Sequence, residues 1–563
     1  MAGHLTAVYG PEIGRQTLQR LQAVIGRYGH LPSSCGRGTG DERELSQKDC
    51  VLITYPDQLR EPGVPPLRTL GDFCEQHLPG IVSAVHLLPF YPWSSDDGFA
   101  VKDYRAVDSA LGTWDEVTRL GRHFRLMFDA VINHASAHSE WFQGFLRDDP
   151  RYREFFITVV GDPDLAGVVR PRALPLLTEF KTPSGRSKVW TTFSADQVDL
   201  NYRNPEVLLE IVDLLLFYAA RGAQFIRLDA IAYLWKEIGT PCVHLPQTHH
   251  VIQLLRAALD EVAPHVMLIT ETNVPHAENV SYFGDGTDEA QLVYNFSLPL
   301  LLLHTFRAGE ARTLSQWAAS LRLPSDRVTF FNFLASHDGL GLNPVRGLLS
   351  EADIDALLRQ TLAHGGRVSY KHNPDGSQSP YELNINYFDA LSNPAGPEPL
   401  ATQVKRFMAA QTIMLALPGV PGLYFHSLFG SRGWPQGVQQ TGHHRTINRQ
   451  KLARVAVERE LADPTSLRHL VFTRYAQLLR IRAASPAFHP RAAQRIADYG
   501  ASVFAVERTA LGGAETVVCL HSVSAQAQWV AHAASGVDLI SNERMSQPIH
   551  LAPYQSCWLK LDA

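Results

Sequence analysis

The sequence predicts an α/β protein: a (β/α)8 TIM barrel with an inserted small domain after its third strand and a C-terminal antiparallel β domain. Eight short apolar segments recur with helical stretches between them, which is typical of a parallel barrel. One gap between these segments is too long for an ordinary connection. Past residue 491 the pattern changes to short β-rich runs without helices.

The expected elements follow in order along the 563 residues. Residues 12–30 are amphipathic and predict a helix, and a polar linker over 33–48 leads into the first strand. The strands are expected at 51–55, 84–88, 126–130, 225–228, 267–270, 291–294, 329–333 and 422–425. The parts are expected to be a helical extension over 1–48, the barrel over 49–134 and 223–490, the inserted domain over 135–222, and the β domain over 491–563.

The bulk composition excludes several classes of protein. Charged residues are 19% and the net charge is −5, so no basic surface for nucleic acid is expected. No secretory signal and no apolar run of membrane-spanning length is visible, which predicts a soluble, cytoplasmic protein that does not contact a membrane. The six cysteines are scattered without a C-x-x-C pair, and the histidine pairs have no carboxylate or cysteine at ligand spacing. We therefore expect neither a metal nor another cofactor, and the oligomeric state stays open.

Charged side chains follow several predicted strands at the point where each strand ends. Arg227 and Asp229 lie two residues apart, so in a strand both leave the same face, and a neighbouring cation favours an ionised aspartate. A structural salt bridge would also explain this pair taken alone. However, Glu271 and Asp338 end two further apolar runs, and parallel barrels build active sites at the carboxyl ends of their strands.

Four segments in this order, FDAVINH at 128–134, FIRLD at 225–229, LITETN at 268–273 and FLASHDG at 333–339, resemble the sequence signatures of the α-amylase family, glycoside hydrolase family 13. DLNY at 199–202 resembles the fifth, shorter signature. The resemblance implies that Asp229 is the nucleophile, Glu271 the general acid/base and Asp338 the transition-state stabiliser. It further implies that Arg227 orients Asp229, and that His134 and His337 hold the sugar. Retaining enzymes of this kind place their two carboxyl groups about 5 Å apart.

The segment HLLPFYPWSSDDGF at 86–99 resembles the sucrose phosphorylase subfamily of that family. This resemblance implies that Asp96 and Arg449 close the glucose pocket, with Phe99 and Phe193 as apolar platforms and Gln197 as a polar contact. Such a pocket admits one glucosyl unit. On the acceptor side, the resemblance implies that Arg172 meets phosphate and that Tyr233 and Tyr381 line the site. Solvated charge on the insert is the alternative explanation of Arg170 and Arg172.

Two positions depart from sucrose phosphorylases: Asn273 stands where a histidine is usual, and Glu382 where a glutamine is usual. Together with the segments 93–99, 269–276 and 445–449, these changes make the chain resemble the glucosylglycerate phosphorylases of the same subfamily. Those enzymes convert 2-O-α-D-glucosyl-D-glycerate and phosphate into α-D-glucose 1-phosphate and D-glycerate. This resemblance implies a glycosyltransferase-type phosphorylase whose small-molecule partners are the glucoside, phosphate and D-glycerate.

A glycerate carboxylate is expected to need a cation or several N–H donors in the acceptor site, and Lys236, Arg432 and Arg445 are the candidate cations. Sucrose phosphorylase and glucosylglycerol phosphorylase remain close alternatives, whereas an α-glucosidase or transglucosidase is more distant. A non-catalytic, amylase-like binding subunit is a further possibility, against which the intact set of three carboxylates argues. Some relatives bind calcium near the asparagine that matches Asn133, so the expectation of no metal needs a test.

Overall fold

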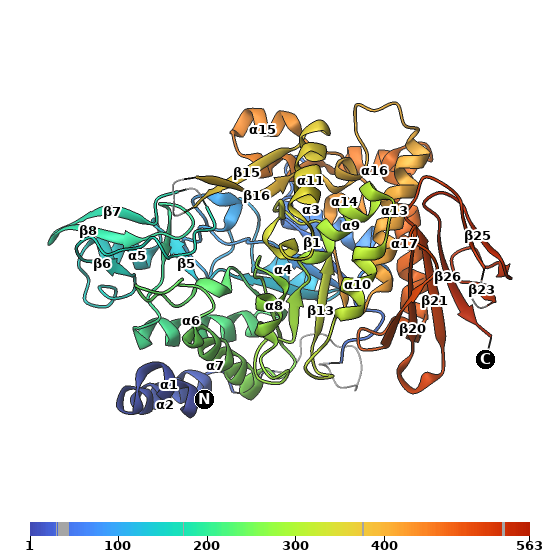
Figure 1. Ribbon diagram of the computed structural model, residues 1–563. Coiled ribbons are helices and arrows are strands. Elements are labelled where there is room, and N and C mark those ends of the chain that lie inside the picture. Colours follow the sequence, from blue (N-terminus) through green and yellow to red (C-terminus); the bar gives the residue numbers. More distant parts are fainter. Residues whose placement is uncertain (30, 32–43, 173, 374–376, 532–534, 563) are drawn as a thin grey trace.

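The computed structural model describes residues 1–562 except 30, 32–43, 173, 374–376 and 532–534, so most of the linker expected at 33–48 lies outside the described residues. Eight parallel strands close into a barrel, which confirms the predicted fold (Figure 1). Around the barrel the strands are β1 (Val51–Thr54), β17 (Val420–Tyr424), β13 (Thr329–Phe333), β12 (Leu292–Tyr294), β11 (Met267–Thr270), β10 (Ala223–Leu228), β4 (Arg125–Ala130) and β3 (Ala84–Leu87).

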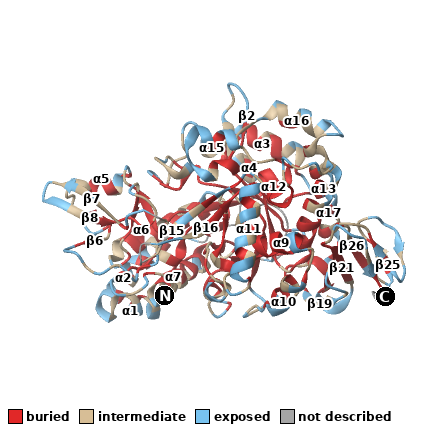
Figure 2. Cartoon of the chain, turned by 45° about the horizontal axis from the view of Figure 1, so that its top comes forward, coloured by how far each residue is buried: buried red, intermediate tan, exposed pale blue. Residues whose placement is uncertain are grey.

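The barrel strands are buried along almost their whole length, because helices cover the outer surface of the parallel sheet (Figure 2). The covering helices are α3 (Pro66–His77), α4 (Trp114–Gly121), α6 (Pro205–Ala220), α7 (Pro246–Val262), α9 (Ser297–Ala308), α10 (Arg312–Ser320), α13 (Leu400–Ala416) and α17 (Leu467–Ala484). Local sequence fixes where these helices begin. Thr113 and Glu116 form a capping box at α4, and the Asn204 side chain accepts from the Glu206 backbone at α6.

The N-terminal segment forms two helices, α1 (Ala2–Tyr9) and α2 (Pro11–Gly26). The single helix expected over 12–30 is therefore too long at its end and misses α1. Gly10 separates the two helices with a φ of 79°, and Pro11 is suited to the first turn of α2. The pair packs against α6 and α7 on the outside of the barrel.

A long segment connects β4 to β10 and forms the inserted domain after the third strand. It contains α5 (Glu140–Leu146), the antiparallel sheet of β6 (Thr158–Val159), β8 (Gly185–Trp190) and β7 (Leu177–Thr182), and the pair β5 (His134–Ser136) and β9 (Gln197–Asp199). The pairing of β5 with β9 brings Gln197 back beside the end of β4. Helix α6 follows and packs on β10, as the other outer helices do.

A hairpin of β15 (Arg367–His372) and β16 (Gln378–Asn384) follows the seventh barrel strand and pairs with β14 (Leu340–Gly341). It carries Tyr381 and Glu382 to the same end of the barrel as the insert. The C-terminal sheet lies at the end of the molecule opposite the inserted domain (Figure 1). Its antiparallel strands are β19 (Ala493–Asp498), β20 (Val503–Thr509), β21 (Thr516–Ser522), β26 (Ser556–Leu561), β23 (Gly536–Asp538) and β24 (Arg544–Met545).

Two buried arginines hold the elements around the last barrel strand together. Arg508 on β20 of the C-terminal sheet donates to the backbone oxygen of Ala416, the last residue of α13, at 2.7 Å. Arg482 on α17 donates to that of Gly419, between α13 and β17, at 3.0 Å. The C-terminal sheet is therefore hydrogen-bonded to the helix that precedes β17. Among the helices that the structure describes, none combines the length and the apolar character needed to cross a bilayer.

Candidate active site

A cavity opens at the carboxyl ends of the barrel strands, between the inserted domain and the hairpin of β15 and β16. Most of the side chains expected in the site line it: Asp96, Phe99, His134, Arg172, Phe193, Gln197, Asp229, Tyr233, Glu271, Asn273, His337, Asp338, Tyr381, Glu382 and Arg445. Arg227 and Arg449 lie behind this lining, and Lys236 and Arg432 lie outside it. Phe296 also lines the cavity and was not expected from the sequence.

Arg227 lies beneath the cavity with only 2% of its side chain exposed, and it holds two carboxylates at once. Its Nη1 is 2.8 Å from Asp229 Oδ1 and 2.5 Å from Asp129 Oδ1. Asp129 in turn lies 2.8 Å from Nε2 of His86 through its second oxygen. Asp129 and His86 were missed as site residues, although both lie in segments that carried the resemblance, because each looks like an ordinary interior strand position.

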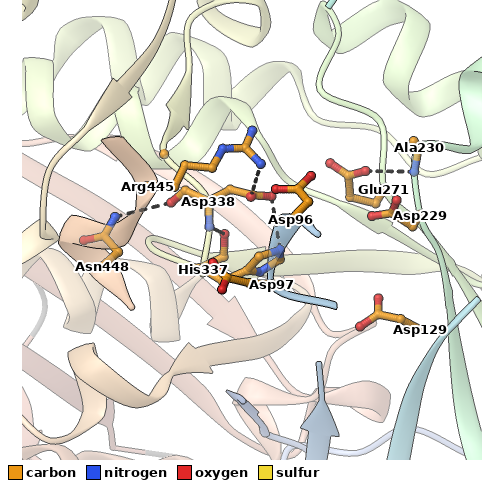
Figure 3. A network of polar contacts seen from close by, with 12 residues as sticks. Asp96, Asp97, Asp129, Asp229, Ala230, Glu271, His337, Asp338, Arg445 and Asn448 are labelled. Atoms are coloured by element: carbon orange, nitrogen blue, oxygen red, sulfur yellow. Dashed lines mark hydrogen bonds and ion pairs between the residues drawn. The ribbon is translucent and has the colours of Figure 1, made fainter. Parts of the chain in front are cut away.

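Asp229 and Glu271 lie side by side at the ends of β10 and β11 (Figure 3). Burial raises the pKa of both Asp229 and Glu271, and the negative charge of Glu271 adds to the effect on Asp229. The sequence-based expectation that Asp229 is ionised took only the positive charge of Arg227 into account. Burial and the neighbouring carboxylates act in the opposite direction, so the pair holds a proton at neutral pH.

Geometry decides which member of the pair carries the proton. Arg227 contacts Asp229 at 2.8 Å but reaches Glu271 only at 3.8 Å, so the guanidinium stabilises a negative charge on Asp229 better. Glu271 Oε2 accepts one hydrogen bond, from the backbone of Ala230 at 3.1 Å. Asp229 is then the ionised carboxylate and Glu271 the carboxylic acid. That is the division of roles that a retaining glycosidase mechanism requires.

Asp338 faces this pair across the cavity and stays ionised. Burial raises its pKa, but the positive charges of the arginines around it outweigh this and hold the pKa well below its usual range. Arg445 Nη1 lies 2.6 Å and Arg449 Nη2 3.4 Å from Asp338 Oδ1. Asn448 donates to the backbone oxygen of the same residue at 3.4 Å (Figure 3). A third carboxylate is thus held ready to stabilise positive charge on a sugar ring.

Neutral histidines and aromatic rings form the rest of the inner pocket. His337 stacks on Phe99 with ring centres 4.8 Å apart and planes 3° from parallel. Burial lowers the pKa of His337 to about 3 and also lowers that of His134. His134 Nε2 lies 2.9 Å from the Phe99 backbone oxygen, and the ring of His134 lies 5.3 Å from that of Phe193. Uncharged imidazoles between apolar rings suit the hydroxyl groups and faces of a sugar.

The two aspartates at the mouth of this pocket have different partners. Asp96 Oδ2 lies 2.7 Å from Arg172 Nη2 and accepts from Gln197 at 3.2 Å. Asp97 Oδ2 lies 2.5 Å from Arg449 Nη1. At the mouth of the pocket, Arg449 therefore pairs with Asp97, the neighbour of the aspartate that was expected beside it. Both aspartates adopt left-handed backbone conformations, with φ of 55° and 50°, which turn the two side chains towards different arginines.

Arg445 lies in the part of the cavity where the acceptor was expected. This guanidinium bridges Asp338 to Glu382, whose Oε1 lies 2.9 Å from Arg445 Nη2 and accepts from the Gly339 backbone at 3.0 Å. Asn273 Oδ1 is buried without a hydrogen-bond partner among the described residues, so it is free to accept from a bound molecule. Burial raises the pKa of Tyr381 and of Tyr233, so both phenols stay protonated as donors.

Two of the three candidate partners of a glycerate carboxylate lie outside the cavity. Lys236 is buried with its Nζ 2.5 Å from Asp199 Oδ2, and it donates to Asn133 Oδ1 at 2.8 Å. Arg432 pairs with Asp389 at 2.7 Å. Neither lines the cavity, whereas Arg445 does. Within the described part of the chain, no group of three or more histidine, cysteine or acidic side chains is placed to hold a metal ion.

Comparisons with known proteins agree with this geometry. The family model described as "Alpha amylase, catalytic domain" matches residues 80–339. The chain is 51% identical to the glucosylglycerate phosphorylase of Allomeiothermus silvanus, over 99% of this chain and 97% of that protein. It is 45% identical to the glucosylglycerate phosphorylase of Escherichia coli, over 99% of both.

More distant relatives share the fold. The sucrose phosphorylase of Bifidobacterium adolescentis is 29% identical over 73% of this chain and 82% of its own. The crystal structure of sucrose 6F-phosphate phosphorylase from Thermoanaerobacter thermosaccharolyticum superposes with a TM-score of 0.74 at 24% identity, covering 86% of this chain and 96% of that one. The similarity is therefore highest to proteins that match the chain along its full length.

Proposed function

Since the chain belongs to the α-amylase family, glycoside hydrolase family 13, we propose that it is a retaining phosphorylase that converts 2-O-α-D-glucosyl-D-glycerate and phosphate into α-D-glucose 1-phosphate and D-glycerate. One observation carries the choice of substrate. Glucosylglycerate phosphorylases are 45% to 52% identical over nearly the whole chain, whereas sucrose and glucosylglycerol phosphorylases are 27% to 29% identical over about three quarters.

The first half of the reaction uses the two carboxyl groups at the ends of β10 and β11. Asp229, ionised beside Arg227, attacks the anomeric carbon and forms a covalent glucosyl ester. The bond between that carbon and the glycerate oxygen breaks, and Glu271 transfers its proton to the departing oxygen. Asp338 lies across the cavity, where its charge stabilises the oxocarbenium-like transition state.

The second half reverses these roles. Once glycerate leaves, a phosphate oxygen attacks the anomeric carbon from the face that glycerate occupied, and Asp229 departs as a carboxylate. Glu271 takes the proton of the attacking phosphate and returns to its acid form. Two inversions at one carbon retain the α-configuration in glucose 1-phosphate.

The charged side chains at the mouth of the inner pocket favour a substrate that places a single glucosyl unit in this pocket. The ion pairs of Asp96 with Arg172 and of Asp97 with Arg449 border the inner pocket, and the stacked rings of Phe99 and His337 lie inside it. Arg172 and Arg445 are the arginines that line the described cavity, and each can donate to phosphate or to a carboxylate. We assign the acceptor subsite to these two groups together with Tyr381 and Asn273.

The five described cysteines are free and buried, which supports our proposal that the enzyme works in a reducing cytoplasm.

The substrate is tested by incubating the enzyme with α-D-glucose 1-phosphate and fructose, glycerol, D-glycerate or water alone. We expect the fastest phosphate release with D-glycerate. Fastest release with fructose or glycerol would identify a sucrose or glucosylglycerol phosphorylase instead, and equal release in water alone a hydrolase.

A further inference from the structure

The arginines around the cavity are already paired with carboxylates. Arg445 binds both Asp338 and Glu382, Arg449 pairs with Asp97, and Arg172 pairs with Asp96. Arg227 beneath the floor holds Asp129 and Asp229. Among the described residues of the site, each guanidinium that an incoming anion could meet therefore already has a carboxylate beside it, and that negative charge opposes the anion. Phosphate or glycerate should bind most tightly where such an ion pair can open.

The pair of Arg172 and Asp96 is the one that can open at least cost. Arg227 and Arg449 are 2% and 5% exposed, and Arg445 holds two carboxylates, so releasing any of them would leave buried charge uncompensated. Arg172 contacts one carboxylate and its side chain is 28% exposed. It also lines both the inner cavity and an outer vestibule bordered by Trp93 and Tyr370, so it can turn towards an anion entering from outside.

Asp96 is the fixed member of the pair. Its left-handed backbone, with a φ of 55°, and the hydrogen bond from Gln197 hold the carboxylate at the mouth of the glucose pocket. A sugar hydroxyl that donates to Asp96 would compete with Arg172 for the same oxygen atoms. Because Arg172 is long and partly exposed, the arginine rather than the aspartate would move.

We propose that Asp96 is an internal counter-ion that occupies Arg172 in the free enzyme, and that a glucosyl unit bound to Asp96 releases Arg172 to bind the acceptor anion. The identity of that anion as phosphate or glycerate rests on the proposed function, whereas the exchange of partners does not. The free enzyme then binds phosphate weakly, and the enzyme carrying a glucosyl unit binds it tightly. By thermodynamic linkage, phosphate must also strengthen the binding of sugar by the same factor.

The test is calorimetric titration of the free, full-length enzyme with inorganic phosphate at constant ionic strength. We expect Asp96→Asn to bind phosphate about tenfold or more tightly than the unsubstituted enzyme, since a charge-assisted hydrogen bond becomes available. Asp97→Asn removes the same charge one residue away from a different arginine, so it controls for the general field. The double variant Asp96→Asn with Arg172→Ala should lose the gain.

A second measurement compares phosphate binding with and without sugar. Saturating D-glucose, which occupies the inner pocket without forming the covalent intermediate, should tighten phosphate binding to the unsubstituted enzyme. The same sugar should leave phosphate binding to Asp96→Asn unchanged, because Arg172 is already free in that variant. Unchanged phosphate affinity with glucose, or an equal gain in Asp97→Asn, would overturn the proposal. These titrations need no turnover, so their failure would leave the proposed reaction intact, whereas the acceptor panel tests that reaction alone.

Discussion

Asp129 lies closer to Arg227 than Asp229 does: its Oδ1 is 2.5 Å from Arg227 Nη1, compared with 2.8 Å for Asp229. Asp129 is fully buried and lies beside His86, so it is the permanent counter-ion of the arginine, whereas Asp229 is partly exposed to the cavity. Arg227 can therefore stay charged and in place when Asp229 becomes a neutral ester. The nucleophile can change its charge during the reaction without leaving a buried cation unpaired.

Replacement of Asp129 tests this role. We expect Asp129→Asn to lower the free energy of unfolding, because it leaves the buried guanidinium of Arg227 with one carboxylate fewer. The loss should not exceed about 3–5 kcal/mol, since the contact of Arg227 with Asp229 remains. Urea unfolding measures the free energy. The exposed pair of Glu179 and Arg186 provides the control, because Glu179→Gln should change stability by less than about 1 kcal/mol. Equal effects of the two substitutions would contradict the assignment.

Replacement of the nucleophile should abolish the transfer of glucose. Asp229→Asn removes the negative oxygen that forms the covalent ester, so both α-glucosyl fluoride and the glucoside should be inactive while the fold is retained. Glu271→Gln should lose activity on glucosylglycerate but keep part of its activity on glucosyl fluoride, since fluoride departs with little proton donation. Substantial turnover by Asp229→Asn would show that another group is the nucleophile.

The activity should fall on the alkaline side. Glu271 must be protonated and Asp229 ionised, and burial raises the pKa of Glu271 above its usual value. As the pH rises above that raised pKa, Glu271 loses its proton, the general acid disappears, and kcat/KM for phosphorolysis declines. The pH profile of Glu271→Gln on glucosyl fluoride should lack this alkaline decline. A profile in which both enzymes decline together would place the titrating group elsewhere.

Arg172 should determine the affinity for phosphate. Arg172→Ala is expected to weaken phosphate binding to the glucosyl-enzyme by about 1.5–3 kcal/mol, the range for charge-assisted hydrogen bonds. The KM for phosphate in phosphorolysis measures the effect. Arg170→Ala, in the same loop but outside the lining of the cavity, is the matched control and should change this KM little. Similar values for the two variants would indicate that the loop acts only by its total charge.

Lys236 should act as a structural cation. It lies between Asn133 and Asp199, where an ammonium group bridges the end of β4 and the inserted domain. Lys236→Met should cost about 3–5 kcal/mol, because Asp199 is left buried without its charge partner. Lys188→Met, which removes a solvent-exposed pair with Asp162 in the same insert, is the control and should cost below about 1 kcal/mol.

The site around Asn133 and Lys236 also provides a test of the expectation that no metal is required. Turnover should survive exhaustive chelation, since both reacting groups are carboxyls of the chain. The readout is activity before and after treatment with a chelator, with and without added calcium. Activity that disappears and returns only with calcium would contradict the expectation and would require Lys236 to leave its position.

The barrel and the position of Asp229, Glu271 and Asp338 in one cavity could be predicted because they depend on local patterns. A strand buried on both faces is a run of apolar residues, and its polar end marks the edge where a parallel barrel carries its site. The spacing of Arg227 and Asp229 likewise places both side chains on one face of β10. Helix α1 was missed because the glycine and proline that separate it from α2 interrupt the amphipathic pattern.

The choice of partners was decided only by the tertiary structure. Arg449 and Asp97 are 352 residues apart, and nothing local shows whether the arginine meets Asp97 or Asp96. The backbone turn at these two aspartates makes that choice. Of the three cations that could serve the acceptor, the fold buries Lys236 against Asp199 and turns Arg432 towards Asp389, which leaves Arg445 in the cavity. The sequence by itself determined which charged groups are present. The tertiary structure decided which of them pair, because an ion pair depends on a distance of a few ångströms between two side chains. The number of residues between two segments does not determine that distance.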